Sequence, residues 1–138
     1  MIYMKRKIKT TERGWAGHFI CSHDCRFRRN TLVECGEKRV VVSTVGDMHY
    51  NASCAKIMGK SVNDPIEIGH KRHYETMAFK ATLQGQYWDA DFGAEEYGVA
   101  EFGFMVTDKN HDIADDLANA MHENNVGYIA QQLREGKI

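Results

Sequence analysis

A strand-like alternation of hydrophobic and polar residues covers most of residues 1–107 of the 138-residue chain. The segments 31–35 and 39–46, joined by the turn Gly-Glu-Lys at 36–38, predict a β-hairpin. The second segment contains three consecutive valines, from Val40 to Val42, which favours burial on both faces. We therefore expect this segment to be the central strand of a sheet.

Weaker patterns predict further strands, at 2–9, 15–20, 74–82, 87–92 and 97–106. Met77 and Phe79 share the apolar side of one of them, and the last three are expected to form an antiparallel meander in which Phe102, Phe104 and Val106 share one face. Ser22 is expected to cap a helical turn that ends near Arg28. The segment 46–73 has no sustained period and is expected to be a long loop.

The periodicity changes to that of a helix over residues 108–135. Apolar residues recur there at steps of three to five, namely Ile113, Leu117, Met121, Val126, Ile129 and Leu133. We expect Asp108 to cap this helix, Gly127 to kink or split it and Gly136 to end it. His122 is expected at the edge of the core or in solvent and is given no role.

Together these elements predict one domain over residues 1–138, of the α+β class. A mostly antiparallel sheet of about five or six strands is packed by a C-terminal amphipathic helix. The composition agrees with a globular chain, since 43% of the residues are hydrophobic and 27% are charged. The sequence shows neither a signal peptide nor an apolar run of about 20 residues, which favours a cytoplasmic protein without membrane contact.

The net charge of −1 conceals two halves of opposite sign. Residues 1–73 contain 14 Lys and Arg against 7 Asp and Glu, whereas residues 74–138 contain 4 against 12. The balances are therefore +7 and −8. Such a chain can neutralise itself on folding, form a homodimer, or present a basic face to a polyanion and an acidic face to a basic protein.

Four metal-ligand candidates lie close together near the N-terminus: His18, Cys21, His23 and Cys25. Their residue types suit zinc, and the spacing of the two cysteines is within the range of zinc hairpins. A structural zinc site normally has a second closely spaced pair, and none follows here. We therefore predict no cofactor and ordinary reduced cysteines, with zinc at these four residues as the alternative.

Three arginines follow directly, Arg26, Arg28 and Arg29, around Phe27. Guanidinium groups beside an aromatic ring can contact phosphates and stack on bases. A nucleic-acid-binding protein is therefore one alternative function.

A second alternative is a small enzyme that acts on a nucleotide or nucleic acid. His70, His73 and Glu75 are its candidate catalytic residues, because they could supply acid, base or ligand groups beside the long loop. The sequence has no nucleophile elbow, phosphate loop, HExxH motif or deaminase-type PCxxC motif, which argues against an enzyme.

Four segments within residues 13–92 resemble known sequences: RGWAGHFICSHDCRFRRNTL, VVVSTVGDM, HYETMAF and YWDAD. They resemble a group of small bacteriophage and prophage proteins without an assigned activity. The resemblance implies an accessory role in the cytosol of an infected bacterium and assigns no catalytic residue. It implies stoichiometric binding to a host or phage protein, or to a nucleoprotein complex, with anti-CRISPR or other anti-defence inhibition as the version to test first.

The acidic half offers a physical route to such binding. Clustered carboxylates at Asp112, Asp115 and Asp116 could imitate a phosphate array and compete for a basic groove. We expect these three residues and the arginines at 26, 28 and 29 to be the binding residues.

Overall fold

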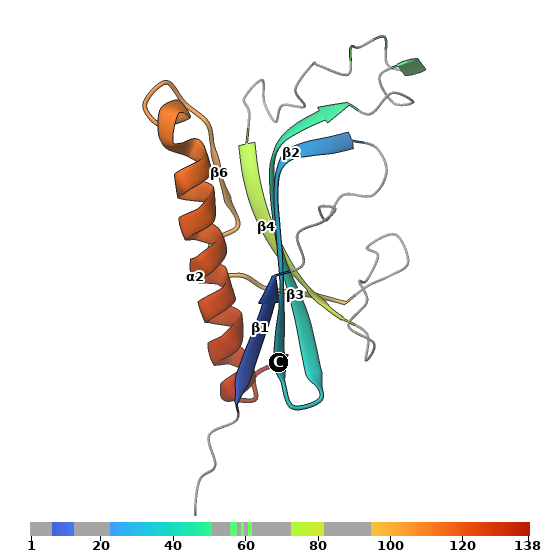
Figure 1. The fold of residues 1–138 in the computed structure, drawn as a ribbon, viewed down its shortest axis with the longest axis vertical. Coiled ribbons are helices and arrows are strands. Elements are labelled where there is room, and N and C mark those ends of the chain that lie inside the picture. The colour runs from blue at the N-terminus through green and yellow to red at the C-terminus, as the bar shows by residue number, and fades with distance from the viewer. Residues whose placement is uncertain are drawn as a thin grey trace, which may run out of the picture.

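A computed structural model describes residues 7–12, 23–50, 56, 57, 59, 61, 73–81 and 95–138, with no side-chain description for 23–26 and 47–50. In this part of the chain, one face of an antiparallel sheet of six strands is covered by the C-terminal helix (Figure 1). The predicted α+β class is therefore confirmed. None of the described helices is both long and apolar enough to cross a membrane.

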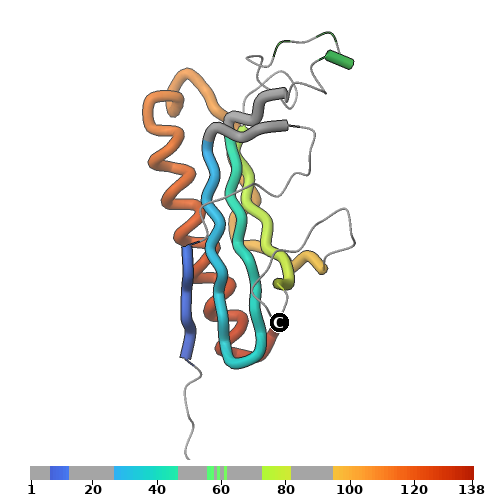
Figure 2. The backbone as a smooth tube through the Cα atoms, turned by 45° about the vertical axis from the view of Figure 1, so that its right-hand side comes forward, coloured from blue at the N-terminus to red at the C-terminus, as the bar shows by residue number. Residues whose placement is uncertain are grey.

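The strands are β1 Ile8–Glu12, β2 His23–Cys35, β3 Lys38–Tyr50, β4 His73–Lys80, β5 Glu96–Tyr97 and β6 Gly103–Met105. A 3₁₀ turn, η2 His111–Ile113, leads into the helix α2 Ala114–Arg134. The strand order is β1-β2-β3-β4-β5, and β6 pairs with β4 beside β5. Figure 2 shows the long β2–β3 hairpin, whose turn lies near the end of α2.

The β2–β3 hairpin was correctly predicted at its turn, where Gly36 has a φ of 63°. It is longer than predicted, because β2 begins at His23 and β3 continues to Tyr50. The predicted helical turn from Ser22 to Arg28 is therefore wrong, and so is a loop that starts at residue 46. Pairing with β3 provides hydrogen-bond partners for the backbone groups of β2 from His23 onward. A single capped helical turn would provide such partners for only a few residues.

The strand predicted at 97–106 is instead two short strands, and both pair directly with β4: β5 with Ala78 and Phe79, and β6 with the beginning of the strand. The predicted strands 15–20 and 87–92 lie outside the described residues. The segment between β5 and β6 leaves the sheet, and the side chain of Asn125 bonds both main-chain groups of Glu101 there. Phe104 packs in the core, whereas Phe102 is exposed, so the two do not share an environment.

Both faces of the central strands are buried, as the valine run predicted. On the face toward α2, Val40 and Val42 pack with Ile129 and Leu133. On the opposite face, Val41 packs in a second cluster with Leu32, Phe79, Ala81 and Met77. Because apolar burial contributes about 25 cal/mol per Å², burial on both faces stabilises this hairpin.

The helix differs from its prediction in phase and in its beginning. Met121, Val126, Ile129 and Leu133 are buried as expected, but Ala114 and Ala118 are buried in place of Ile113 and Leu117. Asp108 does not cap it; Asn110 closes the preceding turn through a 2.7 Å bond from the Thr107 N–H.

The expected kink or split at Gly127 is also wrong. That residue lies on the exposed face of a helix whose buried neighbours hold it continuous. The helix ends as predicted, at Gly136, with a φ of 69°. The N–H groups of Lys137 and Gly136 bond the carbonyls of Gln132 and Leu133, which is a Schellman motif.

Candidate functional site

The candidate metal ligands lie largely outside the described residues. His18 and Cys21 are not described, and His23 and Cys25 are described only as backbone positions of β2. Among the side chains that the structure does describe, no group of three or more His, Cys, Asp or Glu could hold a metal ion. The described Cys35 is a free thiol in the core. Zinc at the four N-terminal residues stays an untested prediction.

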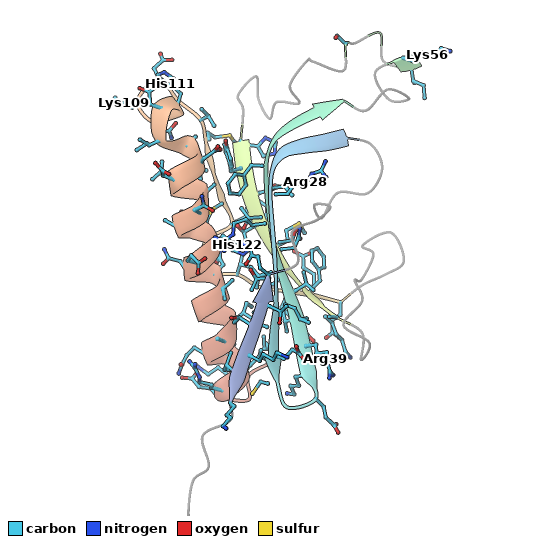
Figure 3. All side chains as sticks on the ribbon, in the orientation of Figure 1. Arg28, Arg39, Lys56, Lys109, His111 and His122 are labelled. Carbon is cyan, nitrogen blue, oxygen red and sulfur yellow. The ribbon has the colours of Figure 1, made fainter. Side chains whose placement is uncertain are left out.

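The arginines do not form one basic surface where their side chains are described. Successive strand residues point to opposite faces, so Arg29 faces α2 whereas Arg28 lies on the other side of the sheet (Figure 3). Arg29 is bonded to Glu12 at 2.9 Å and to Glu123 at 2.7 Å. It therefore neutralises carboxylates of this chain, one of them from the acidic half. Arg26 is described only as a backbone position.

Arg29 joins three elements of the fold: β1, β2 and α2. Its Nε and one terminal nitrogen donate to both oxygens of Glu12, and the other terminal nitrogen donates to Asn119 at 3.3 Å. The bond to Glu12 raises the pKa of Arg29 in spite of burial. Burial alone would raise the pKa of Glu12, but the bonds from Arg29 and Thr31 outweigh it and hold that pKa below its usual value.

A chain of hydrogen bonds continues from Glu12 into the interior between the sheet and α2. Thr31 donates to Glu12 at 2.9 Å and lies 2.7 Å from Nε2 of His122. The other ring nitrogen, Nδ1, lies 2.7 Å from the hydroxyl of Thr44, which in turn lies 2.7 Å from that of Thr76. His122 is fully buried, and Figure 3 shows it between α2 and the sheet. The expectation that it edges the core is therefore wrong.

The carboxylate of Glu12 determines which group donates in each hydrogen bond of this series. An ionised carboxylate only accepts, so the hydroxyl proton of Thr31 points to Glu12. Nε2–H of His122 must then donate to Thr31, which leaves Nδ1 to accept from Thr44. Thr44 in turn accepts from Thr76. The network thus holds one neutral tautomer of His122, and burial, with the charge of Arg29, lowers its pKa to about 4.

Two of the candidate catalytic residues are side by side on one strand. His73 and Glu75 share the face of β4 that points away from α2, and both are buried. Glu75 is opposite Val45, which is opposite Arg28 on β2, so these charged residues lie in one cross-strand row. His70 lies outside the described residues. The role of the three residues stays a prediction.

A cavity of about 560 Å³ lies at the closed end of the β2–β3 hairpin. Its lining combines charged and apolar residues: Glu37, Lys38, Arg39, Val40, Lys80, Ala81, Glu95, Tyr97, Leu133 and Ile138. Its three cations already have partners, since Arg39 pairs with Glu34, Lys80 lies 3.8 Å from Glu95, and Lys38 donates to the carbonyl of Ile138. The charges of this cavity are thus largely compensated within the chain.

The three predicted aspartates are not equivalent. The Asp112 side chain is 84% exposed and Asp116 is exposed, whereas Asp115 turns inward and accepts a 2.7 Å bond from the hydroxyl of Tyr74. Asp112, Asp116 and Glu123 follow one helical row, at spacings of four and seven, and we call them the acidic row. Glu123 is the member that pairs with Arg29, and Asp112 lies 2.9 Å from Nε2 of His111. The sequence has no lysine or arginine between Lys109 and Arg134. Apart from histidine, the charged residues between these two positions are therefore all acidic: Asp112, Asp115, Asp116 and Glu123.

The fold and this helix define a small α+β protein with an acidic helix on one face of an antiparallel sheet. Comparison with known protein families, curated proteins and solved structures found no match to this chain.

Proposed function

We propose that this protein acts by stoichiometric binding, with the acidic row of η2 and α2 as its contact surface and a basic protein groove as its target. The observation that carries the proposal is the arrangement of this face. Asp112 and Asp116 are exposed on successive turns, and no lysine or arginine lies between residues 109 and 134. A row of carboxylates on a rigid helix can compete electrostatically with a phosphate backbone.

The resemblance to small phage and prophage proteins supports an anti-defence role for this binding, in the cytosol of an infected bacterium. In that role the target is a nucleic-acid-binding protein of the host, or a nucleoprotein complex. The binding of Arg29 by Glu12 and Glu123 weakens the alternative in which the chain itself binds nucleic acid, because that guanidinium is already neutralised.

The structure changes which aspartates a test should alter. Asp115 bonds Tyr74 in the core, so a lysine there would perturb the fold as well as the surface. The informative variant is Asp112→Lys with Asp116→Lys, both on exposed positions. Glu37→Lys with Glu96→Lys is the matched control, since it makes the same charge change at exposed positions away from the acidic row.

Each protein is immobilised and exposed to bacterial lysate, and the retained proteins are quantified by mass spectrometry with and without added double-stranded DNA. We expect the parent protein and the control to retain the same basic nucleic-acid-binding proteins, and DNA to displace them. The double aspartate variant should lose them. Equal retention by the parent protein and the aspartate variant would contradict the proposal.

A further inference from the structure

Large apolar side chains are exposed beside the acidic row, on α2 and on the segment that contains β6. Their exposed fractions lie between 37% and 61%, and we call them the apolar strip: Phe102, Met105, Ile113, Leu117 and Tyr128. Single exposed apolar residues are ordinary, but several from adjoining elements mark an interaction surface.

Two side-chain anchors place these elements next to each other. Leu117 and Tyr128 lie on one line of α2, eleven residues apart, and the buried Asn125 lies next to Tyr128 on the side toward the sheet. Asn125 bonds the main chain of Glu101, directly before Phe102. Nearer the beginning of the helix, Asn110 donates to the carbonyl of Met105 at 3.0 Å. The β6 segment is thus held along this flank, as Figure 1 shows, and the strip extends over both elements.

The dimensions and charges of the strip indicate what would cover it. From Ile113 to Tyr128 the helix rises by roughly 22 Å at 1.5 Å per residue, which matches about four turns of a second helix. Exposed carboxylates border the strip, with Asp112 on η2, Asp116 on α2 and Glu101 before β6. An apolar strip bordered by acids is complementary to a helix with one apolar face and basic edges.

We propose that the apolar strip binds a basic amphipathic helix of the partner protein, with its apolar face on Leu117 and Tyr128 and its cations toward the aspartates. This inference rests on the proposed function and names the element of the partner that docks. Binding then requires the apolar side chains as well as the charges.

The test uses two fluorescein-labelled 18-residue peptides of lysine and leucine with the same composition. One places its leucines on a single helical face, and the other distributes them evenly. Fluorescence anisotropy gives the Kd of each peptide for the full chain. We expect the patterned peptide to bind at least about tenfold more tightly than the distributed one, because only it can cover the apolar strip.

Variants separate the apolar contribution from the charge. Leu117→Ser with Tyr128→Ser should weaken the patterned peptide about tenfold and leave the distributed one unchanged. Ile57→Ser, which removes an exposed apolar side chain outside the strip, is the control and should change neither Kd. Circular dichroism verifies that each variant is folded.

Three results would overturn the inference: equal Kd values for the two peptides, an unchanged Kd in the Leu117 and Tyr128 variant, or sedimentation showing that those residues hold a homodimer. The Asp112 and Asp116 double lysine variant tests the proposed function separately. If it weakens both peptides while the serine variant weakens neither, the acidic row still binds and only the docked helix is refuted. If it weakens neither, the proposed function fails.

Discussion

The buried His122 should make the protein lose stability well above the pH at which its carboxylates are protonated. In the folded protein its pKa is about 4, against 6.5 for an unperturbed histidine. The folded state therefore binds this proton more weakly than the unfolded state. The stability that comes from the neutral ring is complete above pH 6.5 and is lost as the pH falls toward 4.

The expected size follows from these two values. One pKa unit corresponds to about 1.4 kcal/mol, so the full loss below pH 4 is about 3 kcal/mol. Between pH 7 and pH 5 the loss from His122 is about 2 kcal/mol. Glu12 adds its own loss only below pH 4.5, the ordinary pKa of a glutamate, since its pKa is lowered in the folded state. Of these two groups, only the histidine therefore contributes between pH 7 and 5.

The measurement is urea unfolding at pH 7, 6 and 5, followed by circular dichroism, for the parent protein and for His122→Gln. Glutamine keeps one donor and one acceptor for Thr31 and Thr44 but does not titrate. The parent protein should lose about 2 kcal/mol more than this variant between pH 7 and 5. Parallel losses in the parent protein and His122→Gln would refute the reasoning.

Three further predictions concern the stability effects of substitutions at Arg29, Gly46 and Gly127. Arg29→Ala should lower the free energy of unfolding by about 2 kcal/mol, because its carboxylate partners lose a charged donor, and Arg29→Lys should recover part of it. Gly46→Ala should destabilise by at least about 1–3 kcal/mol, since its Cβ would overlap the ring of Tyr74. Gly127→Ala meets open space on the helix and should stabilise by about 0.5–1 kcal/mol. Urea unfolding at pH 7 measures all four variants, and destabilisation by Gly127→Ala or tolerance of Gly46→Ala would contradict this account.

The sequence correctly predicted the part of the sheet that is formed by residues close together in the chain. The turn at Gly36 and the valines that follow it identify the hairpin and its central strand. Residues 23–28 carry no such signal, and their strand forms because β3 is long enough to pair with them. In the same way, β5 and β6 are short and form because they pair with β4. The sequence between residues 97 and 106 contains no signal that two separate strands form there and that both pair with β4.

The spacing of apolar residues did not predict which face of α2 is buried. The buried polar residues decide it, and they also decide which apolar side chains stay exposed. A buried row through Ile113 and Leu117 would use the largest side chains, but Ala114 and Ala118 are buried instead, beside Tyr74. Turning the helix to bury Leu117 would move His122 away from the hydroxyls of β2 and β3. Each buried polar group left without a partner costs about 1–3 kcal/mol. The polar network therefore fixes the phase of α2, and by fixing it leaves Leu117 exposed at the surface.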